Sequence, residues 1–539
     1  MRKEENMQDN NNRKTERVTE LIAQVNKLPL EEVIGRVVEL VPRGPHYLGL
    51  CPFHADHQLG SFVVTPSKNL WKCFADGFGG NGIAFEMRYY DLNFLEAVFR
   101  LALDFGLIGQ SEYVSLSRKR YDKEVINRAK ARIEETTKIP QNKAADIRIR
   151  DTVYRAMQAV CPLSARHREH LERERQVSDL EYYFTFPTKR VLPVTRAMFL
   201  QIGEELSRRY CGKRYEDLPE GEVSKLDKLA HQAVERGPHS LHYTTVSLLP
   251  VQTLSLPSKI IRYLGDQMAE GKEVLSLAEI REIDDRLSEV RKQFPYVPGF
   301  FINEKGELDF VSYSGIGLLA VNEKDQVAGV PVRRDRIRTG ESRYIWMSSS
   351  FAGIKDGYSG GASSGSPGGF IPARNGSRPQ LCVTEGRFKA EKIADKGNDA
   401  VYVSGVSTWK SILPMLQNVA HGRHSVYIMF DADAMGNVAV HRQLTMFAEA
   451  LAKDGFRPRL LVWPKERGKG FDDLVINTGE RYASYMKSES LEDFEAGYQK
   501  ALRMVLDKYH VDDVRGIGPD SSAAFCADLQ SAVEEKIFA

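Results

Sequence analysis

Four apolar runs decide the fold of this 539-residue chain: QLCVTEG (380–386), DAVYVSG (399–405), SVYIMFDAD (425–433) and RPRLLVW (457–463). A stretch with the amphipathic pattern of a helix follows each of the first three runs, and a loop follows the fourth. Short apolar strands that alternate with such helices are typical of an α/β unit with a largely parallel sheet. We therefore expect residues 373–478 to form a unit of this kind.

Acidic residues stand where the predicted strands end. Glu385 ends the first strand, Asp431 and Asp433 end the third, and Asp472 follows the fourth. Because the carboxyl ends of parallel strands share one edge of a sheet, we expect these acids to meet in one crevice. Clustered carboxylates repel one another unless a hard cation such as Mg²⁺ or Mn²⁺ neutralises them. The alternative is that these acids only begin solvated loops.

Composition narrows the class of protein. The chain has 75 Lys+Arg against 73 Asp+Glu and a net charge of +2, so charge alone does not indicate a nucleic-acid partner. No apolar run approaches the roughly 18 residues of a membrane span, and the segment MRKEENMQDNNNRK has no apolar signal region. Six cysteines are too few for a disulfide framework. We expect a cytoplasmic protein without membrane contact.

Two short pairs of metal-ligand residues occur near the N-terminus. Cys51 and His54 form one pair and Cys73 and Asp76 the other, each with two residues between its members. This spacing lets two turns close a tetrahedral Zn²⁺ site. Three alternatives stay open: Asp76 is the fourth ligand, His57 replaces it, or strands hold the segment without metal.

The same segment also offers contacts for single-stranded DNA. Lys68 suits a phosphate and Trp71 suits a stacked base. We expect two neighbouring aromatic residues, Phe62 and Phe74, to fill the core of the small domain instead.

A basic β element lies between these two regions. GIGLLAV (315–321) and VAGVPVRR (327–334) predict a hairpin that carries Arg333 and Arg334, with Arg343 shortly after it. Guanidinium groups suit phosphates, so these residues are candidate template or nucleotide contacts. Adjacent strand residues face opposite sides, so Arg333 and Arg334 cannot line one groove without a bulge. Plain surface charge is the alternative.

The rest of the chain supplies the domain boundaries. We expect a multidomain protein of α/β and α+β class, with the segment DGYSGGASSGSPGG (356–369) as a flexible loop. Besides the α/β unit, the expected parts are a disordered tail at 1–18, a Cys-containing domain at 19–107, a basic helical linker at 108–150, a helical and then β subdomain at 151–372, and a helical region without evident chemistry at 479–539.

Three regions of the chain resemble parts of known domains. CPFHADHQLGSFVVTPSKNLWKCFADGFGGNGIAFEM (51–87) is similar to the CHC2 zinc-binding domain of bacterial DnaG-type primases. TEGRFKA (384–390), FDADAMG (430–436) and KGFDDLV (469–475) resemble the three acidic motifs of the Toprim domain that primases share with topoisomerases and some nucleases. LLAVNEKDQVAGVPVR (318–333) and SRYIWMSSS (342–350) are similar to the basic element before Toprim, which implies that Arg333 and Arg343 contact template or nucleotide.

The chain departs from the Toprim pattern at two positions. Lys389 stands where these primases usually carry an Asp, and Gly470 stands where they carry another acid. The lysine either replaces a cation or touches a nucleotide phosphate.

The resemblance implies a DNA primase, a nucleotidyltransferase that joins nucleoside triphosphates into short RNA primers on a single-stranded DNA template during DNA replication. Asp431, Asp433 and Asp472 would hold Mg²⁺, and Glu385 would either ligate metal or transfer a proton. The rival functions are a catalytically silent DNA-binding replication factor and a Toprim-type nuclease. No G-x-x-x-x-G-K-[ST] motif occurs, so a replicative helicase would be a separate partner. The long middle region resembles primases of mobile elements such as plasmids and phages.

Overall fold

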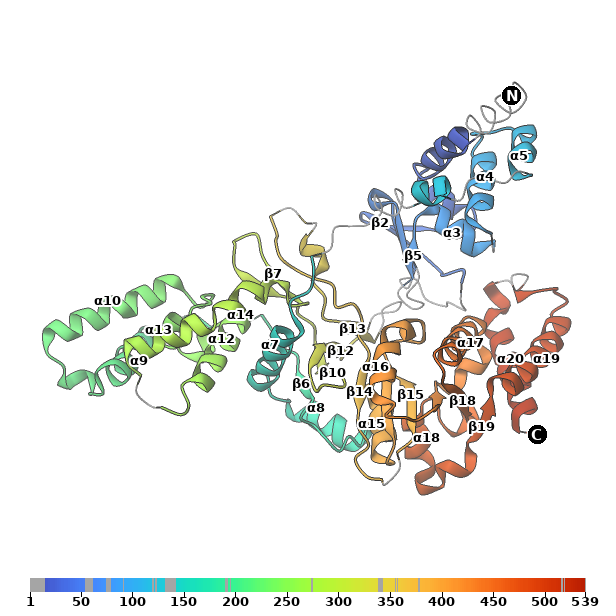
Figure 1. Cartoon of the computed structure of the whole chain (residues 1–539). Helices are drawn as coiled ribbons and strands as arrows, with labels where there is room; N and C mark the ends of the chain where they lie inside the picture. The colour runs from blue at the N-terminus through green and yellow to red at the C-terminus, as the bar shows by residue number, and fades with distance from the viewer. Residues whose placement is uncertain are drawn as a thin grey trace.

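The computed structural model divides into an N-terminal domain, a middle region with a helical arm, and a C-terminal α/β unit (Figure 1). It describes residues 15–53, 62–73, 79–90, 92–118, 121, 124–130, 142–189, 192–193, 195–272, 275–337, 343–353, 355, 357–376, 379–514, 517 and 519–538. No helix in these ranges is long and apolar enough to cross a membrane. The multidomain α/β and α+β class predicted from the sequence is confirmed.

An antiparallel sheet of five short strands forms the centre of the N-terminal domain. The strands follow in chain order: β1 (Val41–Arg43), β2 (His46–Gly49), β3 (Phe62–Thr65), β4 (Leu70–Cys73) and β5 (Gly79–Gly80). Helices α2 (Leu30–Gly35), α3 (Gly82–Tyr89), α4 (Phe94–Asp104) and α5 (Gln110–Ser117) accompany it. Asn93 caps α4 through a capping box with Glu96, which satisfies the first backbone amides of that helix.

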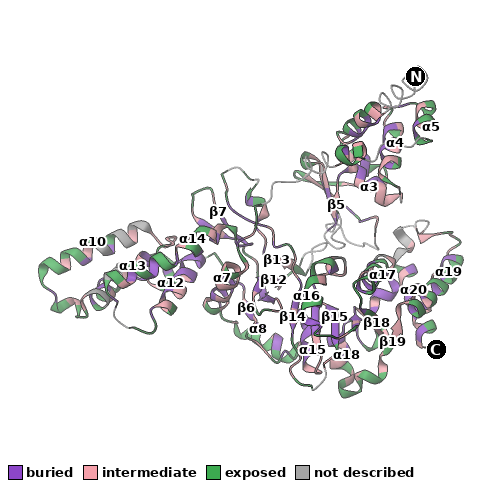
Figure 2. Cartoon of the chain, in the orientation of Figure 1, coloured by how far each residue is buried: buried purple, intermediate pink, exposed green. Residues whose placement is uncertain are grey.

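Helices dominate the middle region. They comprise α7 (Ile147–Val160), α8 (Ala165–Glu169), α9 (Arg196–Leu206), α10 (Glu220–Arg236), α11 (Tyr243–Val246), α12 (Leu256–Met268), α13 (Leu277–Arg286) and α14 (Ser288–Gln293). Helices α9, α10, α12 and α13 form an arm that extends away from the C-terminal sheet (Figure 1). Much of α10 is exposed along this arm (Figure 2).

A four-stranded antiparallel sheet connects the middle region to the α/β unit. Its order is β13 (Tyr344–Trp346), β12 (Pro331–Arg334), β9 (Gly315–Leu318) and β6 (Tyr183–Thr185). The predicted hairpin is confirmed, because β9 pairs with β12 and β10 (Ala320–Val321) pairs with β11 (Val327–Gly329). Strands β7 (Phe300–Ile302) and β8 (Leu308–Phe310) form a separate pair.

The Gly/Ser-rich segment, which its composition predicts to be a flexible loop, is partly buried over its described residues, 357–369. Gly360, Gly361 and Ala362 are buried, and the Gly361 amide donates a 2.7 Å hydrogen bond to Pro295 O. A Cβ at Gly361 would lie 2.2 Å from Ser349 O. Glycine is needed here because the backbone of another segment passes directly over it, so the composition reflects close packing rather than flexibility.

A mixed six-stranded sheet forms the C-terminal unit. Its order is β14 (Gly369–Ile371), β16 (Asp399–Val403), β15 (Leu381–Glu385), β17 (Ser425–Met429), β18 (Arg457–Val462) and β19 (Lys487–Ser490). The inner four strands are parallel, as predicted, and each outer strand is antiparallel to its neighbour. The sheet therefore extends beyond the expected limits of 373 and 478 on both sides.

Helices cover both faces of this sheet. Apolar residues of α15 (Arg387–Asp395) and α18 (Phe471–Thr478) pack on one face, and those of α16 (Leu413–Val419), α17 (Val438–Lys453), α19 (Leu491–Lys508) and α20 (Pro519–Phe538) pack on the other. Figure 2 shows the buried residues concentrated between these layers. Residues 491–538 thus complete the core of the α/β unit instead of forming a separate region.

Candidate active site

The carboxyl ends of two neighbouring strands place the predicted acids together. Glu385 is the last residue of β15. Shortly after β17, Asp431 immediately precedes the 3₁₀ turn η9 (Ala432–Gly436), and Asp433 lies within that turn. Strands β15 and β17 pair in parallel register, and Thr384 Oγ1 donates a 2.8 Å hydrogen bond to Met429 O. Glu385, Asp431 and Asp433 form what we call the carboxylate cluster.

A glycine turns the chain directly after Glu385. Gly386 has a φ of 80°, and open space surrounds the position where a Cβ would lie. Its role is therefore conformational, since this left-handed backbone strains other residues. Helix α15 begins at the next residue, so Lys389 in its first turn points back over the cluster.

Two lysines neutralise the aspartates. Lys389 Nζ lies 2.6 Å from Asp431 Oδ1, whereas Lys469 Nζ lies 2.9 Å from Asp433 Oδ2 and 3.9 Å from Asp431 Oδ2. The Lys389 side chain is only 19% exposed, and that of Lys469 is 60% exposed. Lys389 is therefore part of the site, and Lys469 is a surface residue that water can replace.

The remaining acid of the cluster has an unusual environment. Burial raises the pKa of Glu385; Lys389 and Lys469 oppose this rise, while the charges of Asp431 and Asp433 add to it. The net direction of the pKa shift of Glu385 is upward.

Asp472 reaches the same edge but faces a different partner. It is 5% exposed on α18, and its Oδ2 accepts a 3.2 Å hydrogen bond from Arg175. Its Oδ1 has no hydrogen-bond partner among the residues that the structure describes. Arg175 follows the π-helical turn η2 (His170–Glu174) of the middle region, so this ion pair joins that region to the α/β unit.

Gly470 leaves the space that Lys389 and Asp472 occupy. A Cβ at this position would lie 2.4 Å from Asp472 Oδ1 and 2.5 Å from Lys389 Cε. Its backbone is extended, with φ of −97°, so the reason for glycine is steric. A side chain at position 470 would require the ends of the Lys389 and Asp472 side chains to shift, so the two unusual positions, 389 and 470, lie against each other in the fold.

A group of arginines lies beside Asp472. Arg175, Arg333 and Arg343 form this guanidinium cluster. Burial lowers the pKa of Arg333; Tyr344 raises it, and repulsion from Arg175 and Arg343 lowers it further, so the net direction is downward. An anion placed here would relieve the repulsion among these like charges. Arg334 is the next residue along β12, and its charge instead opposes the rise that burial causes in the pKa of Tyr313. This difference is expected for residues on opposite faces of a strand.

Sequence reasoning missed Arg175. It lies in a run of charged residues, ARHREHLERERQ (165–176), in which alternating arginines and acids give no signal for a single position. Only the tertiary contact with Asp472 distinguishes it from its neighbours.

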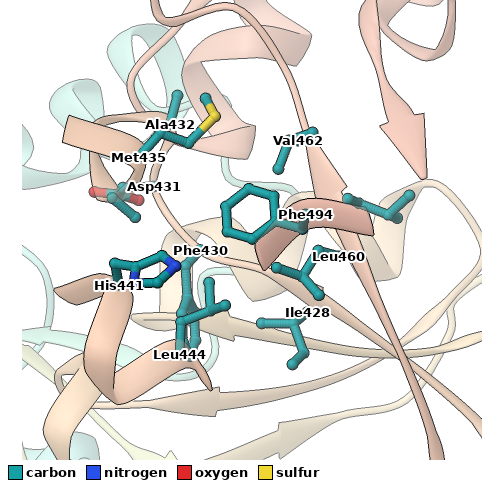
Figure 3. Close-up of a pocket in the computed structure, with 12 residues that line it drawn as sticks. Ile428, Phe430, Asp431, Ala432, Met435, His441, Leu444, Leu460, Val462 and Phe494 are labelled. Atoms are coloured by element: carbon teal, nitrogen blue, oxygen red, sulfur yellow. The ribbon is translucent and has the colours of Figure 1, made fainter. Parts of the chain in front are cut away.

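The C-terminal helix α20 holds the aspartate loop from behind. Gln530 Nε2 donates a 3.0 Å hydrogen bond to Ala432 O, and a Cβ at Gly436 would lie 2.6 Å from Cys526 O. Figure 3 shows Asp431 and Ala432 at the rim of a small apolar pocket that also includes His441 and Phe494. The loop that carries Asp431 and Asp433 is therefore packed against α20.

The N-terminal domain buries two of the expected zinc ligands in one hydrophobic cluster. Cys73 ends β4, and Cys51 follows β2; both are buried. All six cysteines lie within the described residues, and none forms a disulfide. His54, His57, Phe74 and Asp76 lie outside the described residues. Over the described part of the chain, no group of three or more His, Cys, Asp or Glu side chains is arranged to hold a metal ion.

The two expected DNA contacts of this domain differ in exposure. Lys68 is exposed, whereas Trp71 is 1% exposed and its indole Nε1 donates a 3.0 Å hydrogen bond to Asn81 O. Phe53, Phe62 and Phe85 surround the indole ring. The expectation that Trp71 stacks on a base is therefore corrected, because its apolar ring fills the core; Phe62 is buried as predicted.

Comparison with known proteins identifies the first of these domains. A family model described as CHC2 zinc finger matches residues 15–115. The N-terminal domain is therefore similar to the CHC2 zinc finger of DnaG-type primases. A second model, a domain of unknown function designated DUF3854, matches residues 375–482.

The curated relatives are DNA primases, and their similarity is confined to a short segment. The chain is 42% identical over 84 residues to the DNA primase of Listeria monocytogenes, which is 15% of this chain and 13% of the relative. It is 37% identical over 95 residues to the DNA primase of Aquifex aeolicus, which is 18% of this chain and 19% of the relative. The chain thus matches less than one fifth of each of these relatives.

Solved structures of primases show only a low overall likeness. The zinc-binding and RNA polymerase domains of Aquifex aeolicus primase have a TM-score of 0.33 and 16% identity, over 96% of this chain and 99% of that chain. A DnaG primase catalytic domain bound to single-stranded DNA has a TM-score of 0.26 and 14% identity, over 64% of this chain and 98% of that chain. These scores do not establish that the whole chains share one arrangement.

Proposed function

We propose that this chain is a DNA primase that joins nucleoside triphosphates into short RNA primers on single-stranded DNA. The observation that carries the proposal is the combination of a DnaG-type CHC2 domain with a carboxylate cluster at the edge of an α/β sheet. Primer synthesis needs cations at such carboxylates and an anion site for the triphosphate. The guanidinium cluster beside Asp472 supplies the second element.

Two residues of the carboxylate cluster, Asp431 and Asp433, suit one divalent cation, although the described residues include no group of three or more such side chains arranged as metal ligands. Lys469 Nζ already stands between Asp431 Oδ2 and Asp433 Oδ2, so a cation suits this place, and the exposed lysine can leave it. Mg²⁺ or Mn²⁺ there would use one or two carboxylates and several waters. A bound ion would neutralise charge on the reacting phosphates.

The side chains of this chain provide binding and proton transfer. Arg175, Arg333 and Arg343 would hold the triphosphate, because their mutual repulsion is relieved by an anion. Glu385 would either ligate the cation or accept the proton of the primer 3′-hydroxyl, in keeping with its raised pKa. Lys68 would contact the template backbone, and Arg334 lies on the other face of its strand as a second candidate.

We also propose that the CHC2 domain binds Zn²⁺ through Cys51 and Cys73. Both thiols are buried in one hydrophobic cluster of this domain, and thiolate is the preferred ligand of structural zinc. His54 and Asp76 are the proposed further ligands. We also propose a separate helicase partner and an origin in a mobile element. The protein would act in the cytoplasm, where primases meet their template.

Primer synthesis by the purified full chain tests the function. The assay uses an unprimed single-stranded template, labelled nucleoside triphosphates and Mg²⁺ or Mn²⁺. We expect template-dependent oligomers from the wild type and at least about a hundredfold less from Asp433→Asn, because transition-state charge is then poorly neutralised. Asp433 is 37% exposed, so the variant should fold. Asp454→Asn is the control, since Asp454 is exposed after α17.

Two outcomes would support the rival functions. Template cleavage by the wild type and not by Asp433→Asn would identify a nuclease. Binding of DNA by both proteins without any primer, across templates and both metals, would identify a silent replication factor.

A further inference from the structure

Asp431 has a cation at each of its carboxylate oxygens. Lys389 Nζ lies 2.6 Å from Oδ1, and Lys469 Nζ lies 3.9 Å from Oδ2 while it contacts Asp433 at 2.9 Å. The structure thus defines two cation positions, which we call the inner position, at Oδ1, and the outer position, between Asp431 and Asp433. Lys389 occupies the inner position and Lys469 the outer one.

The inner position is built into the fold. Helix α15 begins two residues after Glu385, which fixes the direction of the Lys389 side chain. Because Gly470 has no Cβ, there is room for this side chain; a Cβ at that position would lie 2.5 Å from Lys389 Cε. The Lys389 side chain is only 19% exposed, so its ammonium group is enclosed against Asp431.

Asp472 is not available to a second ion in this arrangement. Its Oδ2 is paired with Arg175, and its Oδ1 lies against the space that Lys389 and Gly470 share. Mg²⁺ and Mn²⁺ need room for coordinated water besides their protein ligands. A hydrated ion and the Lys389 side chain cannot both occupy this part of the site.

We propose that Lys389 permanently fills the inner position, so that the carboxylate cluster takes one divalent ion, at the outer position. Lys469 leaves that position for solvent when the ion binds. Lys389 is then a fixed cation of the site and not a nucleotide contact. The proposal deepens the proposed metal-dependent function and rests on it for its meaning, although its test needs no primer synthesis.

Counting bound Mn²⁺ tests the proposal directly. The full chain, saturated with Zn²⁺ and free of DNA and nucleotide, is titrated with Mn²⁺ while electron paramagnetic resonance measures the free ion. The same titration of Asp431→Asn, which lacks the carboxylate shared by the inner and outer positions, removes the contribution of ions bound elsewhere. We expect a difference of one ion per chain; a difference of two would overturn the proposal.

A lysine variant then tests the inner position. Lys389→Met keeps the length of the stem and removes the charge. We expect it to bind a second Mn²⁺ at the cluster, or to bind the first at least tenfold more tightly. Lys469→Met should tighten the single ion without adding another. Unchanged number and affinity in Lys389→Met would overturn the proposal.

Lys396→Met is the matched control. Lys396 follows the end of the same helix, is also 19% exposed and pairs with Glu480 at 2.8 Å, away from the cluster. If Lys389→Met does not fold, the wild-type count still decides the question. If the chain makes no primers but binds one Asp431-dependent ion, only the proposed function fails.

Discussion

The side-chain amide of Gln530 donates a 3.0 Å hydrogen bond to the backbone carbonyl of Ala432, the residue between the two aspartates of the carboxylate cluster. Glu534, one turn further along α20, accepts a 2.9 Å bond from the Lys465 amide in the loop before Gly470. The C-terminal helix therefore positions both loops of the site, although it contributes no side chain to the cluster.

We expect Gln530→Leu to weaken catalysis through position alone. The Ala432 carbonyl loses its partner, which costs about 1–3 kcal/mol for a buried group. Displaced carboxylates should lower kcat for primer synthesis by about tenfold or more, because misplacement of reacting groups is costly, and leave KM for nucleotides within twofold. Gln499→Leu on the exposed side of α19 is the control. Equal losses in both variants would refute a positioning role.

Gly470→Ala should destabilise the fold. The new methyl group would lie 2.4 Å from Asp472 Oδ1 and 2.5 Å from Lys389 Cε, so both side chains would have to shift. Overpacking of this kind typically costs about 1–3 kcal/mol, measurable by chemical denaturation. Gly405→Ala is the matched control, because Gly405 is also extended and open space surrounds it. A Gly470→Ala protein as stable as wild type would show that the contact is not strained.

Cys73→Ser should remove the metal of the CHC2 domain. We expect one zinc per wild-type chain by elemental analysis and less than about a tenth of that in the variant, because structural zinc needs its thiolates. Cys211→Ser, in the middle region, should keep its zinc. A wild-type protein without zinc would favour the metal-free alternative for this segment.

His441 should make stability depend on pH. Burial lowers the pKa of His441 to about 4, although Glu495 at 3.0 Å opposes the shift. The unfolded chain therefore takes up a proton near pH 6.5 while the folded chain does not, so the free energy of unfolding falls as pH drops from about 6.5 towards 4. The loss amounts to at most about 3 kcal/mol.

His441→Phe should flatten this dependence. The His441 ring stacks on Tyr498 with centroids 3.4 Å apart and lies among apolar residues, as Figure 3 shows for Phe494 and Phe430, so phenylalanine fits. Denaturation curves at pH 7 and pH 5 measure the difference for each protein. An unchanged pH slope in the variant would assign the dependence to other groups.

The position of the acids could be predicted from the sequence, whereas their partners could not. Apolar runs at Leu381 and Val426 predicted parallel strands, and strand topology alone then brings Glu385 and Asp431 to one edge. The partners come from other elements: Arg175 lies 297 residues before Asp472, and no local pattern encodes a contact at that separation. The role of Gln530, 98 residues beyond Ala432, is of the same kind.

Some sequence patterns are compatible with two structural roles, and for these residues only the packing of the folded chain shows which role applies. Trp71 has the chemistry of a base-stacking residue and of a core residue, and the neighbouring rings of Phe53, Phe62 and Phe85 settle it as core. The glycines near 361 have the composition of a flexible loop, but they are buried, and a Cβ at Gly361 would lie 2.2 Å from Ser349 O.

The sequence by itself determined the parallel strands, the edge at which their acids meet and the kinship of the N-terminal segment, because periodicity and ligand spacing are local properties of the chain. Only the tertiary structure determined which basic side chain pairs with each aspartate. Lys389 and Gly470 are 81 positions apart, yet the Lys389 side chain lies against the place where a Cβ at position 470 would be. Only the folded chain brings such distant positions within contact distance.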